Sequence, residues 1–237
     1  MKKVRSLSGE PGLQMTIVPG ALAGEMAELA RTAGWDVKPS RSAAADLKAA
    51  LQASAAGHLV LFVSPRSRVP THLAQILVPH DGTPATSLTL ATVSGAAVRS
   101  HATIVVLHVA ARELPSQSGS FPAPRLVDHC CHDWREWREE FARRFCRFFP
   151  DALLRVELAI GPREESILKV ARELPADLLI FAWGGVLRAN RARTLCTVSA
   201  LAPCPVLLVA GQPPVVLDAM DIGLMHHPAG EQLKIAV

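Results

Sequence analysis

Short apolar runs alternate with segments of helical spacing from residue 75 to residue 210. The run 75–81 ends in turn residues, the β-branched run 103–109 predicts a fully buried strand, and aromatic side chains recur every three or four positions over 134–148. Further strands are expected at 153–160, 178–182 and 205–210, and helices at 163–174 and 194–202. Because continuous apolar strands require cover on both faces, the order predicts an α/β fold: an open, mostly parallel five-stranded sheet with helices on both faces.

Residues 15–65 hold a shorter set of the same elements. An apolar start leads into an alanine-rich helical stretch, and the set closes with a strand expected at 59–63. The pair Gly20 and Asp36 is separated by 16 residues, as is the pair Gly161 and Asp177. We interpret this as a partial repeat of the last part of the domain that follows, although any two βαβ units share such spacing. The predicted organisation is a partial α/β segment at 1–68, a domain at 75–211 and a tail at 212–237.

Composition narrows the class of protein. Hydrophobic residues make up 49% of the 237 and charged residues 19%, which suits a folded chain with a sizeable core. No apolar run reaches the roughly 20 residues of a membrane helix, and residues 1–10 lack the apolar core of a signal peptide. Five cysteines, an odd number, argue against a disulfide framework, so we expect a cytoplasmic protein. A net charge of +4 permits an anionic ligand without indicating nucleic-acid binding.

Two segments follow strands whose carboxyl ends are expected at the same edge of the sheet. The turn 81–83 follows the first strand of the domain, and 182–185 follows the fourth. Glycines there let backbone N–H groups approach a phosphate, and a helix that begins near Thr194 offers its positive end to an anion. Three arginines of the intervening loop would clamp a polyphosphate: Arg188, Arg191 and Arg193. The alternative is that the glycine pair only forms a turn.

Five segments follow one another in a specific order and spacing: ILVPHDGT (76–83), LHV (107–109), IGP (160–162), ADLLI (176–180) and APCPVLLV (202–209). In this combination they resemble the universal stress protein family. The resemblance implies a five-stranded α/β domain of nucleotide-binding type over residues 75–210. It also implies a homodimer formed through the last strand and a role in cytoplasmic stress responses. One branch of the family binds ATP and another does not.

The resemblance also implies which residues would hold a nucleotide. The ATP-binding branch has Gly-x-x-Gly, nine further residues and then Gly-Ser or Gly-Thr after the fourth strand. Here Ala182 stands at the first glycine, and Cys196 with the next residue replaces the closing pair after about one inserted residue. Because Cβ atoms at these two positions restrict the backbone, we expect a degenerate site. The implied contacts run from the nucleoside to the phosphates: Asp81, Gly185 and Thr197, with Arg188 as a further candidate.

Metal binding and catalysis find little support in the sequence. The run from His129 to His132 holds four potential metal ligands, but zinc sites usually space their pairs by two or more residues. We therefore expect no metal, and a metal-dependent regulator that uses this run is kept as an alternative. No serine lies in a strand–nucleophile–helix elbow, so no catalytic residue is predicted.

Arginines of the helix expected at 133–149 alternate with acidic residues, which indicates a solvated, ion-paired face and not a nucleic-acid surface.

The leading hypothesis is a non-catalytic, cytoplasmic stress-response homodimer with a degenerate nucleotide site. The alternative is an ATP-binding switch or slow ATP hydrolase of the same family.

Overall fold

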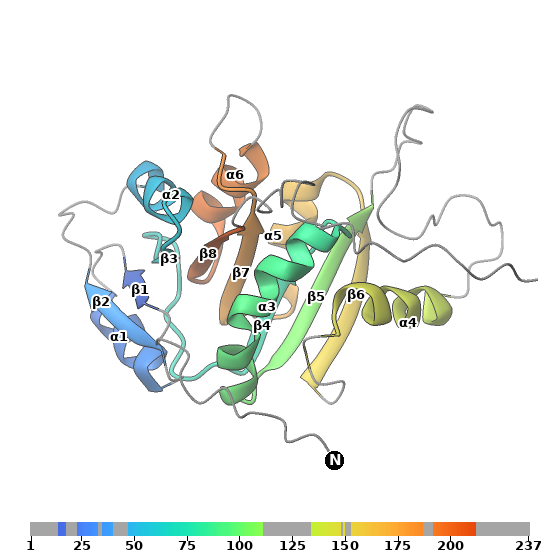
Figure 1. Ribbon diagram of the computed structural model, residues 1–237, viewed down its shortest axis with the longest axis horizontal. Helices are drawn as coiled ribbons and strands as arrows, with labels where there is room; N and C mark the ends of the chain where they lie inside the picture. The colour runs from blue at the N-terminus through green and yellow to red at the C-terminus, as the bar shows by residue number, and fades with distance from the viewer. Residues whose placement is uncertain are drawn as a thin grey trace, which may run out of the picture.

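Strands and helices alternate along the part of the chain that the structure describes (Figure 1). This computed structural model describes residues 14–17, 23–32, 35–39, 47–110, 134–147, 149, 153–186 and 192–211. The strands are β1 (Gln14–Ile17), β2 (Asp36–Pro39), β3 (Leu59–Phe62), β4 (Gln75–Pro79), β5 (Thr103–Ala110), β6 (Leu154–Ile160), β7 (Leu178–Trp183) and β8 (Val206–Ala210). The helices are α1 (Ala23–Thr32), α2 (Leu47–Ala55), α3 (Pro84–Arg99), α4 (Trp134–Phe145), α5 (Arg163–Glu173) and α6 (Arg193–Leu201). None of these helices has both the length and the apolar character that crossing a membrane requires.

The eight strands form one sheet in the order β2-β1-β3-β8-β7-β4-β5-β6. Strands β4 to β8 are the five predicted for the domain, and every pairing among them is parallel. The predicted α/β class and mostly parallel sheet are therefore confirmed. From β4 the strand order proceeds to β5 and β6 on one side, whereas β7 and β8 lie on the other. The carboxyl ends of β4 and β7 thus form the topological switch point, where open α/β sheets bind their ligands.

Strands β1 to β3 extend this sheet beyond the five strands that the sequence predicted. Strand β3 pairs antiparallel with β8, with Val60 opposite Leu208 and Phe62 opposite Val206. The outer edge of the domain's last strand is therefore filled by the same chain. This is the edge through which the family resemblance implied a homodimer.

The neighbours of β1 disagree with the repeat predicted from sequence spacing. Aligning Gly20 with Gly161 and Asp36 with Asp177 makes β1 and β2 the counterparts of β6 and β7, which are not neighbours in the sheet. Instead β1 pairs with both β2 and β3, as β4 pairs with β5 and β7. The strand neighbours of the N-terminal segment therefore differ from those that this alignment implies, and the spacing it used is common to any βα unit.

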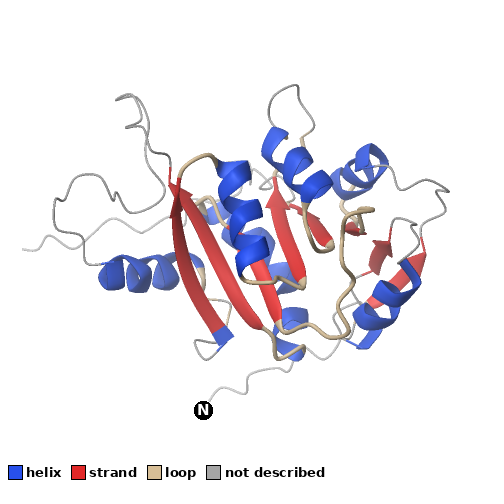
Figure 2. Ribbon diagram, turned by 180° about the vertical axis from the view of Figure 1, so that it is seen from behind, coloured by secondary structure: helices blue, strands red, loops and turns tan. Residues whose placement is uncertain are grey.

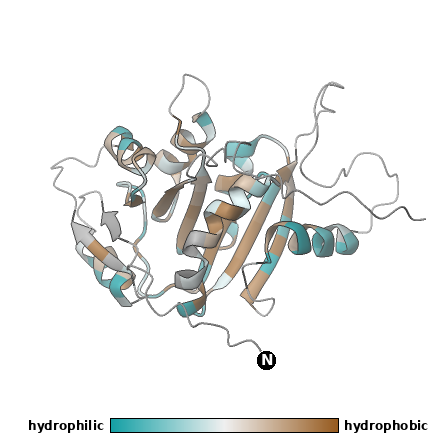
Figure 3. Cartoon of the chain, in the orientation of Figure 1, coloured by the Kyte–Doolittle hydropathy of each residue, from teal (hydrophilic) through white to brown (hydrophobic). Residues whose placement is uncertain are grey.

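Alternate strand residues supply two hydrophobic cores, one on each face of the sheet. Ile76 and Val78 of β4 belong to the core shared with α1, α3 and α4, whereas Leu77 belongs to the core shared with α2, α5 and α6. Figure 2 shows α5 and α6 from the face opposite to α3, and Figure 3 shows hydrophobic strands behind a largely hydrophilic α4. Met26 and Leu51 bring the N-terminal segment into both cores, so it packs together with the domain.

Helix α4 carries the aromatic face that the sequence predicted. Trp137, Phe141 and Phe145 are buried, and the helix ends at Phe145, before the predicted residue 149. Its exposed side carries ion pairs that join Arg135 to Glu139 and two further arginines to Glu140. The prediction of a solvated, ion-paired face is confirmed.

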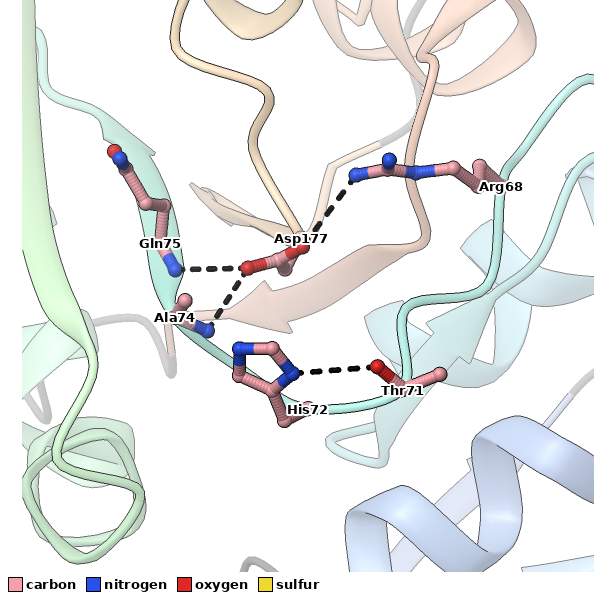
Figure 4. A network of polar contacts seen from close by, with 6 residues as sticks. All are labelled: Arg68, Thr71, His72, Ala74, Gln75 and Asp177. Carbon is pink, nitrogen blue, oxygen red and sulfur yellow. Dashed lines mark hydrogen bonds and ion pairs between the residues drawn. The ribbon is translucent and has the colours of Figure 1, made fainter.

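Asp177, one residue before β7, fastens the start of β4 (Figure 4). Its Oδ2 accepts hydrogen bonds from the backbone N–H groups of Ala74 at 2.8 Å and Gln75 at 2.9 Å. The guanidinium of Arg68 lies 3.6 Å from Oδ1. The carboxylate thus ties the segment before β4 to the neighbouring strand β7, which gives the ADLLI stretch a structural role.

Candidate functional site

A cavity of about 450 Å³ lies at the switch point between the carboxyl ends of β4 and β7. Its volume falls in the range of small-molecule sites. The lining comes from strand ends, from the turns that follow them and from α3, α5 and α6: Pro79–Asp81, Thr86, Leu107–Val109, Arg163, Ile167, Phe181–Gly184, Val186, Ala192, Thr194 and Leu195. The cavity brings Asp81 together with residues 182–184 of the predicted segment 182–185.

The turn after β4 is built from hydrogen bonds among its own residues. Asp81 Oδ1 accepts one bond from the backbone N–H of Thr83 at 3.0 Å and one from its hydroxyl at 2.8 Å. Thr83 Oγ1 accepts a bond from the N–H of Thr86, which caps the N-terminus of α3. Gly82 has a φ of +78°, a left-handed conformation that favours glycine. The turn therefore holds the Asp81 carboxylate at the cavity.

His80 is buried beside this turn as a neutral imidazole. Its Nδ1 accepts a hydrogen bond from the N–H of Gly82 at 2.9 Å, so the ring proton lies on Nε2 and is donated to Ser87 Oγ at 3.1 Å. Burial lowers the pKa of His80 to about 4, the Asp81 charge opposes this shift, and His108 adds to it. This serine and histidine form a pair, but the histidine donates to the serine and so has no lone pair to accept its proton.

His108 of β5 also lines the cavity and is held by the neighbouring strand. Its Nδ1 donates a hydrogen bond to the backbone carbonyl of His80 at 2.9 Å, which leaves the lone pair on Nε2. The ring lies 5.3 Å from the ring of Phe141 and 5.8 Å from that of Trp137. Burial lowers the pKa of His108, and the bond to the His80 carbonyl opposes this shift. Both histidines are therefore uncharged near neutral pH.

The α6 end of the cavity contains a hydroxyl that is already engaged. Thr194, the second residue of α6, donates its Oγ1 proton to Glu164 Oε1 at 2.8 Å. The hydrogen bond from its own backbone N–H, together with the one from Thr194, holds the pKa of Glu164 below its usual range. Partial burial opposes this, and Arg193 and Arg163 add to the lowering. A carboxylate thus stands beside the N-terminal end of α6.

The structure brings some of the predicted site residues together and not others. Asp81 lines the cavity, whereas Thr197 lies one turn further into α6 and is not part of the lining. Gly185 has a φ of +70° and faces Ala210, and its neighbour Gly184 lines the cavity in its place. Arg188 lies outside the described residues.

Thr194 and His108 are two of the cavity residues that sequence reasoning missed. Thr194 is the ninth residue after Gly185, so the family spacing without an insertion puts the closing pair directly after it, at residues 195 and 196. His108 belongs to the LHV stretch, but a lone histidine in an apolar strand gave no signal of a cavity. No group of three potential metal ligands occurs among the described residues, and the run from His129 to His132 lies outside them.

Comparison with known proteins adds one family and several structures of similar fold. The sequence model of the Universal stress protein family matches residues 73–210, more than half of the chain. A universal stress protein in complex with cAMP is 16% identical, with 60% of this chain and 99% of that chain covered and a TM-score of 0.44. A functionally unknown protein from Pseudomonas aeruginosa is 14% identical, with coverages of 84% and 82% and a TM-score of 0.48. A universal stress protein from Archaeoglobus fulgidus in complex with dAMP is 13% identical, with coverages of 58% and 98% and a TM-score of 0.38. A search of curated proteins finds no match.

Proposed function

Because the chain belongs to the universal stress protein family, we propose that it is a non-catalytic, cytoplasmic stress-response module with a degenerate nucleotide site. The observation that carries this proposal is the contrast between the two ends of the cavity. At one end the Asp81 carboxylate is presented by an ordered turn, as a nucleoside contact requires. At the other end the groups that would hold phosphates are altered.

The phosphate end does not fit a polyphosphate. Ala182 stands at the first glycine of the ATP-binding pattern, and its Cβ limits how closely a ligand approaches the backbone. The hydroxyl of Thr194 is bonded to the Glu164 carboxylate and not free for a phosphate oxygen. A carboxylate repels a phosphate at close range, so this donor set disfavours the charged tail of ATP.

The polar groups around the cavity also support a non-catalytic role. His80 donates to Ser87, so this pair is not arranged for nucleophilic catalysis. Away from the cavity, burial raises the pKa values of the Cys146 and Cys204 thiols to about 12, which keeps both protonated near neutral pH. Neither thiol is therefore an active nucleophile.

The alternative function, an ATP-binding switch or slow ATP hydrolase, is favoured by one observation. The cavity has a volume typical of small-molecule sites and lies at the switch point of the sheet. A ligand bound at this place is consistent with the fold. The two functions differ in whether the phosphate end of the cavity binds the phosphates of ATP.

The homodimer remains a prediction of the family resemblance, and its surface must differ from the one that resemblance implied. Strand β3 already pairs with β8 within the chain. The free edges of the described sheet are instead those of β2 and β6. A homodimer that retains this fold would use one of these edges or a helical face.

Titration calorimetry with ATP and magnesium separates the two functions. For a degenerate site we expect no binding in the micromolar range and no release of inorganic phosphate above the buffer rate. Adenosine serves as the matched ligand, because it keeps the nucleoside and lacks the charged tail. Micromolar binding of ATP would instead establish the switch, and phosphate release that depends on the protein would establish the hydrolase.

A further inference from the structure

Glu164 occupies the place beside α6 where the positive end of the helix would attract an anion. It lies in the first turn of α5, and its Oε1 accepts the hydroxyl proton of Thr194 at 2.8 Å. Thr194 and Arg163, the residue before Glu164, both line the cavity. The carboxylate is therefore next to the cavity, on the side where α5 and α6 meet.

The first turn of α6 has no cap of its own. Its N-cap residue is Ala192, which makes no side-chain hydrogen bond. A negative charge at a helix N-terminus is favourable because it offsets the partial positive charge of the exposed N–H groups. Glu164 supplies that charge from the neighbouring helix, so the protein provides its own anion.

The hydrogen bonds that Glu164 accepts favour its ionised form near neutral pH. Its pKa is held below the usual range by the hydrogen bond from its own backbone N–H and by that from Thr194, and burial opposes this only in part. Arg193 and Arg163 act in the same direction as these hydrogen bonds. The carboxylate in turn offsets the positive charge of these arginines, which a phosphate would otherwise meet.

We propose that Glu164 is a specificity-determining residue that excludes polyphosphate from the α6 end of the cavity and restricts the ligand to an uncharged nucleoside or a similar heterocycle. This inference rests on the proposed function, since it explains why the phosphate end is degenerate. It attributes weak binding of ATP to the charge of the Glu164 carboxylate, and not to the Cβ atom at residue 182 alone.

The test compares the wild type with Glu164→Gln and Glu165→Gln. Glutamine at 164 removes the charge and keeps an oxygen that accepts the Thr194 proton. Glu165 is the matched control, because it lies in the same turn of α5 and is exposed. Each protein is titrated with ATP and with adenosine by calorimetry at the same salt concentration, and thermal melting checks that each variant is folded.

We expect Glu164→Gln to bind ATP about tenfold or more tightly than the wild type, since one like charge at close range is removed. Adenosine affinity should change less than about threefold, because the nucleoside carries no charge to repel. Glu165→Gln should match the wild type for both ligands.

Four results would overturn the inference, and they show whether the proposed function fails with it. Unchanged ATP affinity in Glu164→Gln, with weak binding in the wild type, removes the role of Glu164 and leaves the degenerate site intact. Equal gains in both variants show a general charge effect and not a local one. Micromolar ATP binding by the wild type overturns the degenerate site itself, and absence of adenosine binding to all three proteins overturns the ligand class.

Discussion

The indole N–H of Trp183 donates a hydrogen bond to the hydroxyl oxygen of Ser54 at 3.0 Å. Trp183 is the last residue of β7 and lines the cavity, whereas Ser54 is fully buried in α2. The bond therefore joins the N-terminal segment to the wall of the candidate site. It gives this segment a role in holding the site, in addition to extending the sheet.

Ser54→Ala removes the acceptor of this indole N–H. We expect the free energy of unfolding to fall by about 1 kcal/mol, the usual cost of losing one internal hydrogen bond. Urea denaturation followed by circular dichroism measures it. In a double-mutant cycle with Trp183→Phe, the two losses should be less than additive, because either change alone removes the bond. Fully additive losses would show that the two side chains are not coupled.

Asp177→Ala leaves the N–H groups of Ala74 and Gln75 without their acceptor, and we expect the free energy of unfolding to fall by about 3 kcal/mol. Asp177→Asn retains one carbonyl oxygen and should lose less. Arg68→Ala should cost less than about 1 kcal/mol, because the arginine side chain is 67% exposed and its ion pair is screened. Chemical denaturation of the three variants tests this order, and an Arg68→Ala loss as large as that of Asp177→Ala would contradict it.

Buried His80 makes stability depend on pH. Its pKa is about 4 in the folded protein and 6.5 when unperturbed, so between these values the unfolded chain binds a proton that the folded chain does not. The His80 contribution is complete above the unperturbed pKa and is lost as pH falls towards the folded value. From about pH 7.5 to about pH 5 we expect a loss of about 2 kcal/mol from this residue.

Denaturation midpoints of the wild type and of His80→Asn at both pH values measure this effect. The asparagine has no titration in the range, so its stability should fall less over the same interval. Parallel losses in the two proteins would assign the pH dependence to other groups.

The pairing of β3 with β8 within one chain can be tested by a disulfide. Val60 and Leu208 face each other in the register, and opposed residues of antiparallel strands lie within disulfide range. We expect the double variant Val60→Cys with Leu208→Cys to form an intramolecular bond on oxidation and to migrate as a single chain on a non-reducing gel. The two single variants control for the native cysteines. A cross-linked band at twice the mass would show that the strands pair between two chains.

The class of fold could be predicted because each strand of the domain carries its own signal. Residues 104–107 of the run 103–109 are apolar and all buried, which requires a sheet covered on both faces. The connection between the N-terminal segment and the domain could not be predicted in the same way. Leu61 pairs with Leu207 between two apolar strands. The sequences of these strands indicate neither which strand is the partner nor whether the pairing is parallel or antiparallel.

The candidate site could be predicted in its position and not in its details. The turn at Asp81 and the segment after β7 come together because strand order dictates it. The hydroxyl at the α6 end could not be placed from spacing alone, since the family pattern puts its closing pair at residues 195–196, or at 196–197 with the assumed insertion, and not at Thr194. The Glu164–Thr194 bond depends on how two helices pack, which a linear pattern does not contain.

Strand β8 follows all the other strands along the described chain, yet it lies near the middle of the sheet, between β3 and β7. During synthesis on the ribosome, β3 emerges long before the strand that it must meet. The edge of β3 that pairs with β8 therefore stays without a partner until residues 206–210 have left the exit tunnel. Pairing between strands so far apart in the sequence slows folding. A nascent chain of this protein consequently depends on β8, or on a chaperone that shields β3 until β8 is available, to join the N-terminal segment to the domain.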